Sequence, residues 1–147
     1  MADSVVIDAS FAFRLLLPGP RQASCRELME RWRGEGSSLS APSLWIYEVT
    51  SALCKAVHFD QLTRDEGRRA LALAHSLEVR LVVPDAGLTG SAYGWTLRLG
   101  RASAYDSFYV ALAERAGAAL WSADHRLVDA LVNHGVTWAY WIGGDAP

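Results

Sequence analysis

Short apolar segments alternate with longer, helix-compatible segments from one end of the chain to the other. Apolar runs that favour buried strands cover residues 5–8, 38–41, 80–83, 118–122 and 136–142. The segments predicted to be helical are residues 11–17, 22–33, 42–57, 63–77, 89–99, 103–116 and 125–133. This alternation predicts an α/β fold, a three-layer α/β/α arrangement in which helices cover both faces of a mostly parallel central sheet of about five strands.

Two helix starts carry a specific local signal. Thr63 and Glu66 are spaced as a capping box, in which the Thr hydroxyl and the Glu carboxylate each accept a backbone N–H at the start of the helix. Pro42 fits the first turn of the preceding helix, because the N–H that proline lacks has no partner there. We therefore expect the helices over 42–57 and 63–77 to begin at these residues.

The size and composition of the chain are those of one globular domain. With 147 residues, of which 51% are hydrophobic and 20% charged, the chain can bury a substantial core without disulfides or bound metals. It contains no internal repeat, low-complexity tract or linker. We therefore expect a single domain that spans residues 1–147.

The composition disfavours several functional classes. A formal net charge of −2 is unlike that of an indiscriminate nucleic-acid binder. No apolar run approaches the roughly 20 residues that a membrane span needs, and the N-terminus lacks the basic and apolar segments of a signal peptide. Cys25 and Cys54 have no metal-ligand spacing, which favours free thiols in a reducing environment. The sequence thus predicts a cytoplasmic protein without a membrane anchor.

Two aspartates lie at the ends of predicted strands. Asp8 ends the strand over residues 5–8, and Asp124 lies two residues beyond the strand over 118–122. In open α/β sheets, ligands bind beyond the carboxyl ends of the strands. If both strands are central and parallel, Asp8 and Asp124 emerge at the same edge of the sheet. Alone, each has an ordinary structural interpretation as a turn residue or a helix cap.

Two further acids interrupt helix faces that are otherwise apolar. Glu48 lies three residues after Trp45 and four before Ala52, which puts it on the buried stripe of its helix. Asp106 shares a helix face with Val110 and lies in the first turn, where the helix dipole favours a carboxylate. That dipole is enough to explain Asp106 alone, whereas an unpaired Glu48 facing a core is costly.

Four acids gathered at one edge of a sheet need a neutralising cation. Crowded carboxylates raise one another's pKa unless a cation neutralises them, and Mg²⁺ prefers a few carboxylates together with waters and substrate phosphates. A metal held in this way can activate a water and stabilise the charge that develops on a phosphodiester. Ser10 and Ser122 can hold a metal-bound water or a carboxylate, and ordinary turn and capping roles explain them equally well.

The motifs around these acids resemble those of the PIN-domain family, and within it the VapC-type toxins of bacterial and archaeal toxin–antitoxin pairs. The matching segments are VIDAS at residues 6–10, YEV at 47–49, SAYDSFYVALAE at 103–114 and SADHRL at 122–127. LLLP at residues 15–18 and QLTRDE at 61–66 add supporting similarity. The resemblance covers nearly the whole chain, and its specificity comes from four motifs in this order and at these spacings.

The resemblance implies an endoribonuclease that depends on Mg²⁺ or Mn²⁺ and acts as the toxin of a type II toxin–antitoxin pair. Its metal-binding, catalytic acids map onto Asp8, Glu48, Asp106 and Asp124. Asp8 and Asp106 match the firmest ligands of the family, and Asp124 is expected to act through a water or a second metal. Ser10 and Ser122 match hydroxyl positions near the family's site. The family also implies a homodimer and a small cognate antitoxin, similar to VapB, that inserts a segment into the active-site groove.

Basic and aromatic residues near the acids have open roles. Arg14 lies one or two helical turns past Asp8, and Arg126 closely follows Asp124; either arginine can meet an RNA phosphate or an antitoxin carboxylate. Residues 19–38 and 85–101 are candidates for the RNA groove, the dimer contact or the antitoxin contact. The aromatic segment 138–141 is interpreted as a buried last strand, with RNA stacking as the less favoured alternative.

Other functions stay open at the level of the sequence. A two-component receiver also has acids at strand ends but needs an acidic pair and a late lysine, and a haloacid-dehalogenase-type phosphatase needs a second aspartate where Ser10 stands. The remaining alternatives are a housekeeping PIN-domain ribonuclease without an antitoxin and a non-catalytic PIN module that binds protein. The sequence does not indicate which RNA or which phosphodiester is cut.

Overall fold

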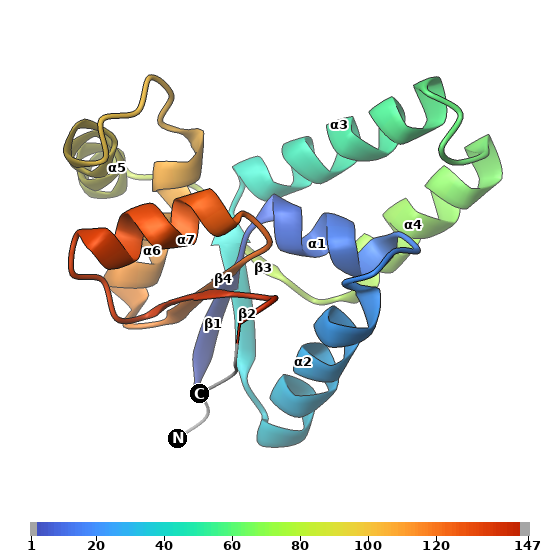
Figure 1. Ribbon diagram of the computed structural model, residues 1–147, viewed down its shortest axis with the longest axis horizontal. Coiled ribbons are helices and arrows are strands. Elements are labelled where there is room, and N and C mark those ends of the chain that lie inside the picture. The colour runs from blue at the N-terminus through green and yellow to red at the C-terminus, as the bar shows by residue number, and fades with distance from the viewer. Residues whose placement is uncertain (1–2, 145–147) are drawn as a thin grey trace.

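The strands form a five-stranded sheet in which all strands are parallel. The computed structural model describes residues 3–144, and its strands are β1 (Ser4–Ile7), β2 (Ser38–Pro42), β3 (Arg80–Val82), β4 (Ala119–Ser122) and β5 (Ala139–Trp141). Their order across the sheet is β3-β2-β1-β4-β5, so the first strand of the chain is the central one (Figure 1). The prediction of an α/β fold with a parallel sheet of about five strands is confirmed.

The central position of β1 follows from its apolar, β-branched residues. Val5, Val6 and Ile7 are buried almost completely, as expected of a strand covered on both faces. Val5 pairs with Leu39 of β2 on one side and with Ala119 of β4 on the other. Because both edges of β1 are paired, whatever follows Ile7 is held rigidly at the carboxyl end of the sheet.

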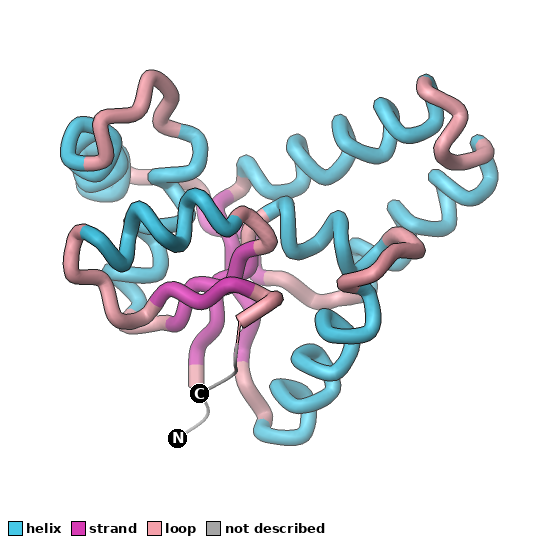
Figure 2. Tube along the Cα trace, viewed as in Figure 1, coloured by secondary structure: helices cyan, strands magenta, loops and turns pink. Residues whose placement is uncertain are grey.

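Helices cover both faces of the sheet. The described residues form α1 (Ala9–Leu16), α2 (Gln22–Glu35), α3 (Leu44–His58), α4 (Arg64–Ser76), α5 (Ala86–Arg98), α6 (Tyr105–Ala116) and α7 (His125–Asn133). Helices α1–α4 lie on one side of the sheet and α5–α7 on the other, with the strands between them (Figures 1 and 2). The predicted three-layer arrangement is therefore confirmed.

The two layers of helices follow from the strand order. From β1 to β3 the chain steps outward in one direction, and from β3 to β4 and β5 it steps in the other. Because parallel crossovers are right-handed, this reversal moves the helices from one face to the other. The reversal falls between β1 and β4, and the carboxyl ends of two strands at such a switch point flank the crevice where ligands bind in open α/β sheets.

The core joins the helices of both faces to the central strands. On one face, the ring of Phe11 lies 5.5 Å from that of Trp32, which in turn lies 5.8 Å from Trp121 of β4. On the other face, α6 packs on β1, β2 and β4 and buries Val110 and Ala113 completely. The first turn of α6 is thereby fixed beside the switch point.

One helix start predicted from the sequence is wrong. Pro42 does not open a helix: it is the last residue of β2 and pairs with Val82, and α3 begins only at Leu44. Proline is tolerated here because the pairing of β2 with β1 stops at Ser40, so that no ladder N–H is lost.

Other helix starts are set by side-chain caps. The predicted capping box is confirmed, since Glu66 N–H donates to the Thr63 hydroxyl and Thr63 N–H donates to the Glu66 carboxylate, each at 3.1 Å. Helix α5 begins at Ala86 and not at residue 89, because the Asp85 carboxylate accepts the Leu88 N–H at 2.8 Å. The last strand is shorter than predicted and covers only Ala139–Trp141.

The remaining expectations about the chain concern membranes and thiols. Within residues 3–144, no helix is both long and apolar enough to cross a membrane. Both cysteines are free, Cys25 buried and Cys54 exposed. Burial raises the pKa of the Cys25 thiol to about 11, so this side chain behaves as a core residue and not as a nucleophile.

Candidate active site

Asp8 and Asp124 stand at the switch point of the sheet. Asp8 directly follows β1, and Asp124 lies two residues after β4. Since β1 and β4 are parallel neighbours, both carboxylates emerge at the same edge, as the sequence predicts. Each also caps the next helix: Asp8 accepts the Phe11 N–H at 2.8 Å and Asp124 accepts the Leu127 N–H at 3.2 Å. The capping interpretation is therefore confirmed for both, and it does not exclude a role in a site.

Asp8 is buried and is held by neutral donors. Only 5% of the residue is exposed. Its Oδ1 accepts the Ser10 hydroxyl at 2.7 Å in addition to the Phe11 N–H, and its Oδ2 accepts the Ser122 hydroxyl. Burial raises the pKa of Asp8 to about 6, and the negative charge of Asp106 adds to the increase, while the three hydrogen bonds oppose it. The carboxylate is thus fixed in place by neutral donors, and no basic side chain of residues 3–144 forms an ion pair with it.

Ser10 and Ser122 join the two strand ends. Their hydroxyl oxygens lie 3.3 Å apart. The Ser10 oxygen accepts the Ala123 N–H at 3.0 Å, and the Ser122 oxygen accepts the Asp124 N–H at 2.9 Å. The sequence leaves open whether these serines hold a metal-bound water, hold a carboxylate or act as ordinary turn and capping residues, and in the structure both hydroxyls donate to Asp8. They lock the β1–α1 junction to the β4–α7 junction.

Glu48 reaches the same rim from α3. It is half-buried beside the fully buried Val49 and Trp45, which agrees with its place on the inner stripe of the helix. The Tyr109 hydroxyl donates to Glu48 Oε1 at 2.6 Å. Burial raises the pKa of Glu48, and the charge of Asp106 raises it further, while the Tyr109 hydrogen bond lowers it. One oxygen of Glu48 is held by this tyrosine, and the other is free to bind a ligand.

Asp106 is the common neighbour of the acids. It lies in the first turn of α6, and its charge acts on both Asp8 and Glu48, while the charge of Asp124 acts on Asp106. Burial raises the pKa of Asp106, and Arg101 opposes the increase. Arg101 Nη1 lies 3.0 Å from Asp106 Oδ2. Within residues 3–144, Arg101 is the one basic side chain that forms an ion pair with any of the four acids.

The four acids influence one another's ionisation, but their oxygens are not arranged as ligands around a single ion. In the described part of the chain, no three His, Cys, Asp or Glu side chains lie close enough together to hold a metal ion as they stand. The chemistry of the group nevertheless fits a hard divalent cation, because its donors are all carboxylate oxygens, and burial and the charge of neighbouring acids raise the pKa of Asp8, Glu48 and Asp106.

Two residues of the site escape the sequence analysis. Tyr109 lies three residues after Asp106 on α6, on the same helix face, and that spacing is the signal that points to it. Arg101 belongs to the loop before α6, where no periodic pattern indicates which way a side chain points. Their contacts show that both belong to the site: Arg101 donates to Asp106, and Tyr109 donates to Glu48.

A comparison with protein families decides which kind of domain carries these acids. A model of the PIN domain matches residues 5–131. The chain belongs to the PIN-domain family. The ribonuclease VapC9 of Mycobacterium tuberculosis is 38% identical over 125 residues, which are 85% of this chain and 89% of that protein. A VapC ribonuclease of Mycobacterium bovis has the same identity and coverage. The resemblance inferred from the four motifs is thus confirmed.

Solved structures share the fold of this PIN domain. PAE2754 from Pyrobaculum aerophilum has a TM-score of 0.68 at 22% identity, with 97% of this chain and 92% of that chain covered. VapC20 of M. tuberculosis, a toxin that cleaves the sarcin–ricin loop, has a TM-score of 0.65 at 20% identity, with 86% and 94% covered. VapBC2 from Rickettsia felis, bound to a promoter DNA fragment, has a TM-score of 0.64 at 12% identity, with 84% and 90% covered.

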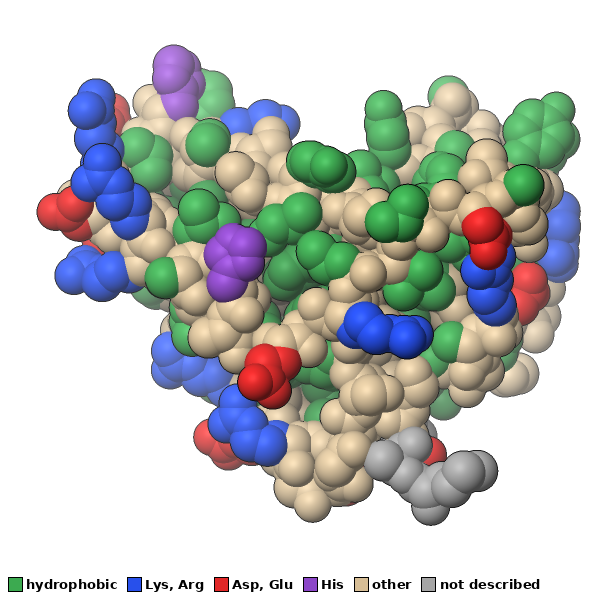
Figure 3. All heavy atoms as spheres, turned by 180° about the vertical axis from the view of Figure 1, so that it is seen from behind, with side chains coloured by type: hydrophobic (Ala, Val, Ile, Leu, Met, Phe, Trp, Pro, Cys, Tyr) green, Lys and Arg blue, Asp and Glu red, His purple; other side chains and the backbone are tan. Residues whose placement is uncertain are grey.

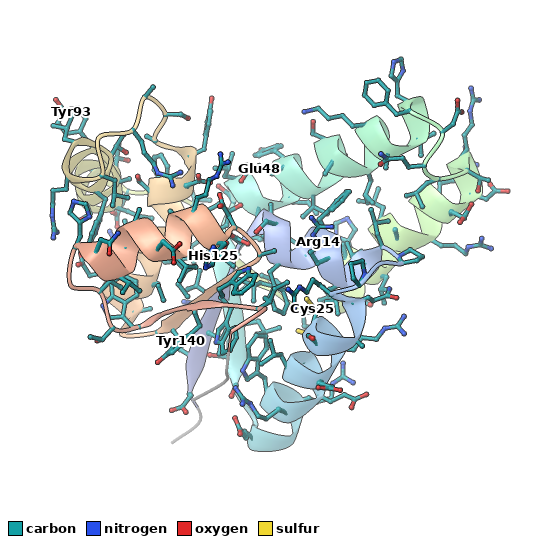
Figure 4. The ribbon with its side chains drawn as sticks, viewed as in Figure 1. Arg14, Cys25, Glu48, Tyr93, His125 and Tyr140 are labelled. Atoms are coloured by element: carbon teal, nitrogen blue, oxygen red, sulfur yellow. The ribbon has the colours of Figure 1, made fainter. Side chains whose placement is uncertain are left out.

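The predicted basic residues lie around the rim of the PIN domain and not in its centre. Arg14 on α1 and Arg126 on α7 are both exposed, and neither forms an ion pair with an acid of residues 3–144. Figure 4 shows Arg14, Glu48 and His125 projecting from α1, α3 and α7 around the carboxyl end of the sheet. Both arginines are thus accessible to an anion.

Proposed function

We propose that this PIN domain is a divalent-metal-dependent endoribonuclease that hydrolyses RNA phosphodiesters as the toxin of a type II toxin–antitoxin pair. The observation that carries the proposal is the common rim of Asp8, Glu48, Asp106 and Asp124, where burial and mutual repulsion raise the pKa of the first three. The identity of 38% to VapC9, a ribonuclease, supports the same activity. We place the activity in one domain over residues 1–147 and, because its substrate is RNA, in the cytoplasm.

The acids would hold Mg²⁺ or Mn²⁺ in the order that the resemblance to the PIN-domain family implies. Asp8 and Asp106 are the first candidates, Glu48 supplies its free oxygen, and Asp124 acts through a water or a second ion. A set of oxygen donors alone suits these hard cations better than it suits zinc. When bound, the ion lowers the pKa of the attacking water and neutralises the charge that develops on the phosphate.

The chain's own side chains prepare this site. Ser10 and Ser122 fix both oxygens of Asp8, so the carboxylate keeps one orientation. Tyr109 fixes one oxygen of Glu48 from the buried side of α6. Ligands that are already oriented lose little conformational freedom when they bind an ion, which is the general function of groups behind a metal site.

We propose that a small antitoxin covers the acids in the resting complex. A chain of a toxin–antitoxin complex from Klebsiella pneumoniae shares this fold. A basic antitoxin segment would neutralise the four acids as a metal does, and Arg14 and Arg126 would meet antitoxin acids at the rim. A short reading frame beside the gene, encoding a small DNA-binding protein, is expected; an isolated gene would favour a housekeeping ribonuclease.

We also propose a homodimer that uses the exposed apolar side chains of α5. Tyr93 and Leu97 are 66% and 62% exposed, and they line a hollow of about 350 Å³ with Phe108. Tyr93 points outward from α5 in Figure 4, and Figure 3 shows hydrophobic side chains exposed at several places on the rear face. Apolar surface of this kind marks interfaces between subunits. Sedimentation analysis of Tyr93→Arg, which should be a monomer, tests the proposal.

The ribonuclease proposal is tested with purified protein and labelled RNA. The protein is expected to cut RNA with Mg²⁺ or Mn²⁺, to stop with EDTA, and to lose roughly 100-fold or more of its rate in Asp106→Asn. Asp65→Asn is the matched control, since Asp65 is an exposed acid paired with Arg68 on α4. Cleavage in EDTA, or full activity of Asp106→Asn, would contradict the proposal.

A further inference from the structure

Three side chains from three elements stack at one corner of the sheet. Trp141 ends β5, His125 begins α7, and Arg21 directly precedes α2. The His125 ring centroid lies 4.4 Å from that of Trp141 with an angle of 50° between the rings. The Arg21 guanidinium carbon lies 5.0 Å from the centre of the Trp141 ring. We call these three residues the Trp141 stack.

The Trp141 stack borders the acids. In the sheet, Trp141 is the direct neighbour of Ser122, whose hydroxyl donates to Asp8. Adjacent strands are about 4.8 Å apart, so the backbone of Trp141 lies one strand spacing from a residue that fixes Asp8. His125 follows Asp124 in the chain. A nucleotide whose phosphate is at the acids therefore has its base within reach of the stack.

The partners of Trp141 differ from those of the other aromatic residues of this segment. Trp138 meets Trp95 edge-on at 6.3 Å, and Tyr140 stacks on Trp121 at 5.1 Å. Those contacts are apolar and need no further explanation than packing. Trp141, half-buried, has a guanidinium and an imidazole against its ring instead. The predicted last strand therefore accounts for the contacts of Trp138 and Tyr140 but not for the partners of Trp141.

The stack also supplies positive charge beside a rim of carboxylates. Arg21 forms no ion pair with an acid of residues 3–144. With Arg14 it lines a hollow of about 300 Å³, which Glu66 also borders. His125 forms an ion pair with Asp129 when protonated, with its Nε2 3.3 Å from Oδ1 and 56% of its side chain exposed. His125 is thus the member of the stack that a ligand can reach.

We propose that the Trp141 stack binds an unpaired base of the RNA strand, in the nucleotide next to the phosphodiester at the acids. Unpaired bases stack on aromatic side chains and on arginine planes, and every base has such a face. Arg21 adds a cation next to the aromatic ring and can reach the neighbouring phosphate. This inference rests on the proposed ribonuclease function and names the group that would hold the substrate's base.

Binding in the absence of metal separates this inference from cleavage. The probe is a labelled single-stranded oligouridylate of about 12 nucleotides, followed by fluorescence anisotropy in EDTA. His125→Ala and Arg21→Gln are expected to weaken binding about five- to 150-fold, the range of one lost stacking contact. The controls remove the same group at the other end of the same helix: His134→Ala on α7 and Arg33→Gln on α2, both at exposed positions. They should stay within about twofold of the unmodified protein.

An abasic oligomer of the same length distinguishes a base contact from a phosphate contact. The unmodified protein should bind the abasic oligomer more weakly than oligouridylate, and His125→Ala should bind both alike. If His125→Ala weakens both oligomers by the same factor, the contact goes to phosphates and the base-binding site is wrong. If the variants bind RNA normally and lose only the antitoxin, the surface binds protein and the inference is overturned.

Tryptophan fluorescence gives a readout that does not depend on affinity. RNA should quench part of the intrinsic fluorescence of the unmodified protein, and this part should be absent in Trp141→Phe, which keeps an aromatic ring at this position. Quenching that persists in Trp141→Phe contradicts the proposal. If the protein cleaves RNA but shows none of these effects, the base-binding role of the Trp141 stack is wrong and the ribonuclease proposal stands. A protein that neither binds nor cleaves RNA overturns the ribonuclease proposal, and the inference falls with it.

Discussion

Two strand–helix junctions of this PIN domain have the same local structure but place their aspartates in different electrostatic surroundings. At the β1–α1 junction Asp8 caps a helix, and at the β3–α5 junction Asp85 does the same. Their backbone angles nearly coincide, with φ −87° and ψ 174° for Asp8 and φ −91° and ψ 178° for Asp85. Each accepts the N–H of the third following residue at 2.8 Å. Local structure cannot tell the two aspartates apart.

The surroundings of the two carboxylates are opposite. Asp8 is buried, its side-chain donors are the neutral hydroxyls of Ser10 and Ser122, and burial raises its pKa to about 6. Asp85 is exposed, and the Arg115 guanidinium holds its pKa down at about 2 with hydrogen bonds to both oxygens. Both aspartates cap a helix, which depends only on the local backbone. What makes Asp8 a candidate for chemistry is that the fold buries its carboxylate and pairs it with no basic side chain.

The largest expected difference between the two junctions is in activity. Asp8→Asn should lower the rate of RNA cleavage with Mn²⁺ roughly 100-fold or more, because a neutral amide is a poor ligand for a hard cation. Asp85→Asn makes the same chemical change and should leave the rate within about twofold. Asparagine caps a helix as well as aspartate does, so both proteins should keep their helices. The rates are measured at saturating Mn²⁺ with the same labelled RNA.

Circular dichroism and binding of Mn²⁺ complete that test. Both variants should show the spectrum of the unmodified protein, and only Asp8→Asn should lose affinity for Mn²⁺. Equal activity of the two variants would show that Asp8 is no more important for cleavage than Asp85, and burial at the switch point would then not mark a functional carboxylate.

A smaller difference is expected in stability, and its sign depends on pH. In EDTA at pH 8, Asp8→Asn should raise the free energy of unfolding by about 3 kcal/mol, because it removes a charge that burial disfavours. Between pH 4 and 6 the folded protein binds more protons at Asp8 than the unfolded chain does. The stability of the unmodified protein therefore falls as pH rises through 6, and the advantage of the variant disappears near pH 4. Urea unfolding at several pH values measures it.

Asp85 is the control, because its carboxylate should change the free energy of unfolding with pH in the opposite direction to that of Asp8. Because its pKa is lowered to about 2, its contribution is present above pH 4 and is lost as pH falls toward 2. Asp85→Asn should therefore make the protein less stable at pH 8 and similar to the unmodified protein near pH 2. An Asp8→Asn protein that is less stable at pH 8, or a difference that does not change with pH, would contradict a carboxylate strained by burial.

The similarity of the two junctions also explains what the sequence predicts and what it does not. The alternation of strands and helices and the carboxyl-end rule are local or topological, so they place Asp8 and Asp124 at one edge correctly. Whether a given Asp is buried depends on residues far away in the chain. Ser122 lies 114 residues from Asp8, and Arg115 lies 30 residues from Asp85.

Other features of the site have the same limit. Tyr109 could be foreseen from its helical spacing to Asp106, but its hydrogen bond to Glu48 joins residues 61 positions apart. Pro42 is a sound helix opener by local rules, and pairing with β3 places it in a strand instead. The partners of Trp141 come from the residue before α2 and from α7, so its sequence context indicates a strand and no ligand site.

The smallest expected effect tests whether charge or burial separates the two aspartates. Arg115→Gln removes the cation from Asp85 without burying it, so the pKa of Asp85 should rise from about 2 toward its ordinary 3.8 and stop there. The Leu88 N–H still donates to the carboxylate and keeps the pKa from rising further. Carbon-detected NMR titration in EDTA measures both groups, with Asp8 near 6 as the internal reference. An Asp85 that rises to the range of Asp8 would mean that losing a cation is sufficient, whereas an Asp85 that stops at 3.8 leaves burial at the switch point as the cause.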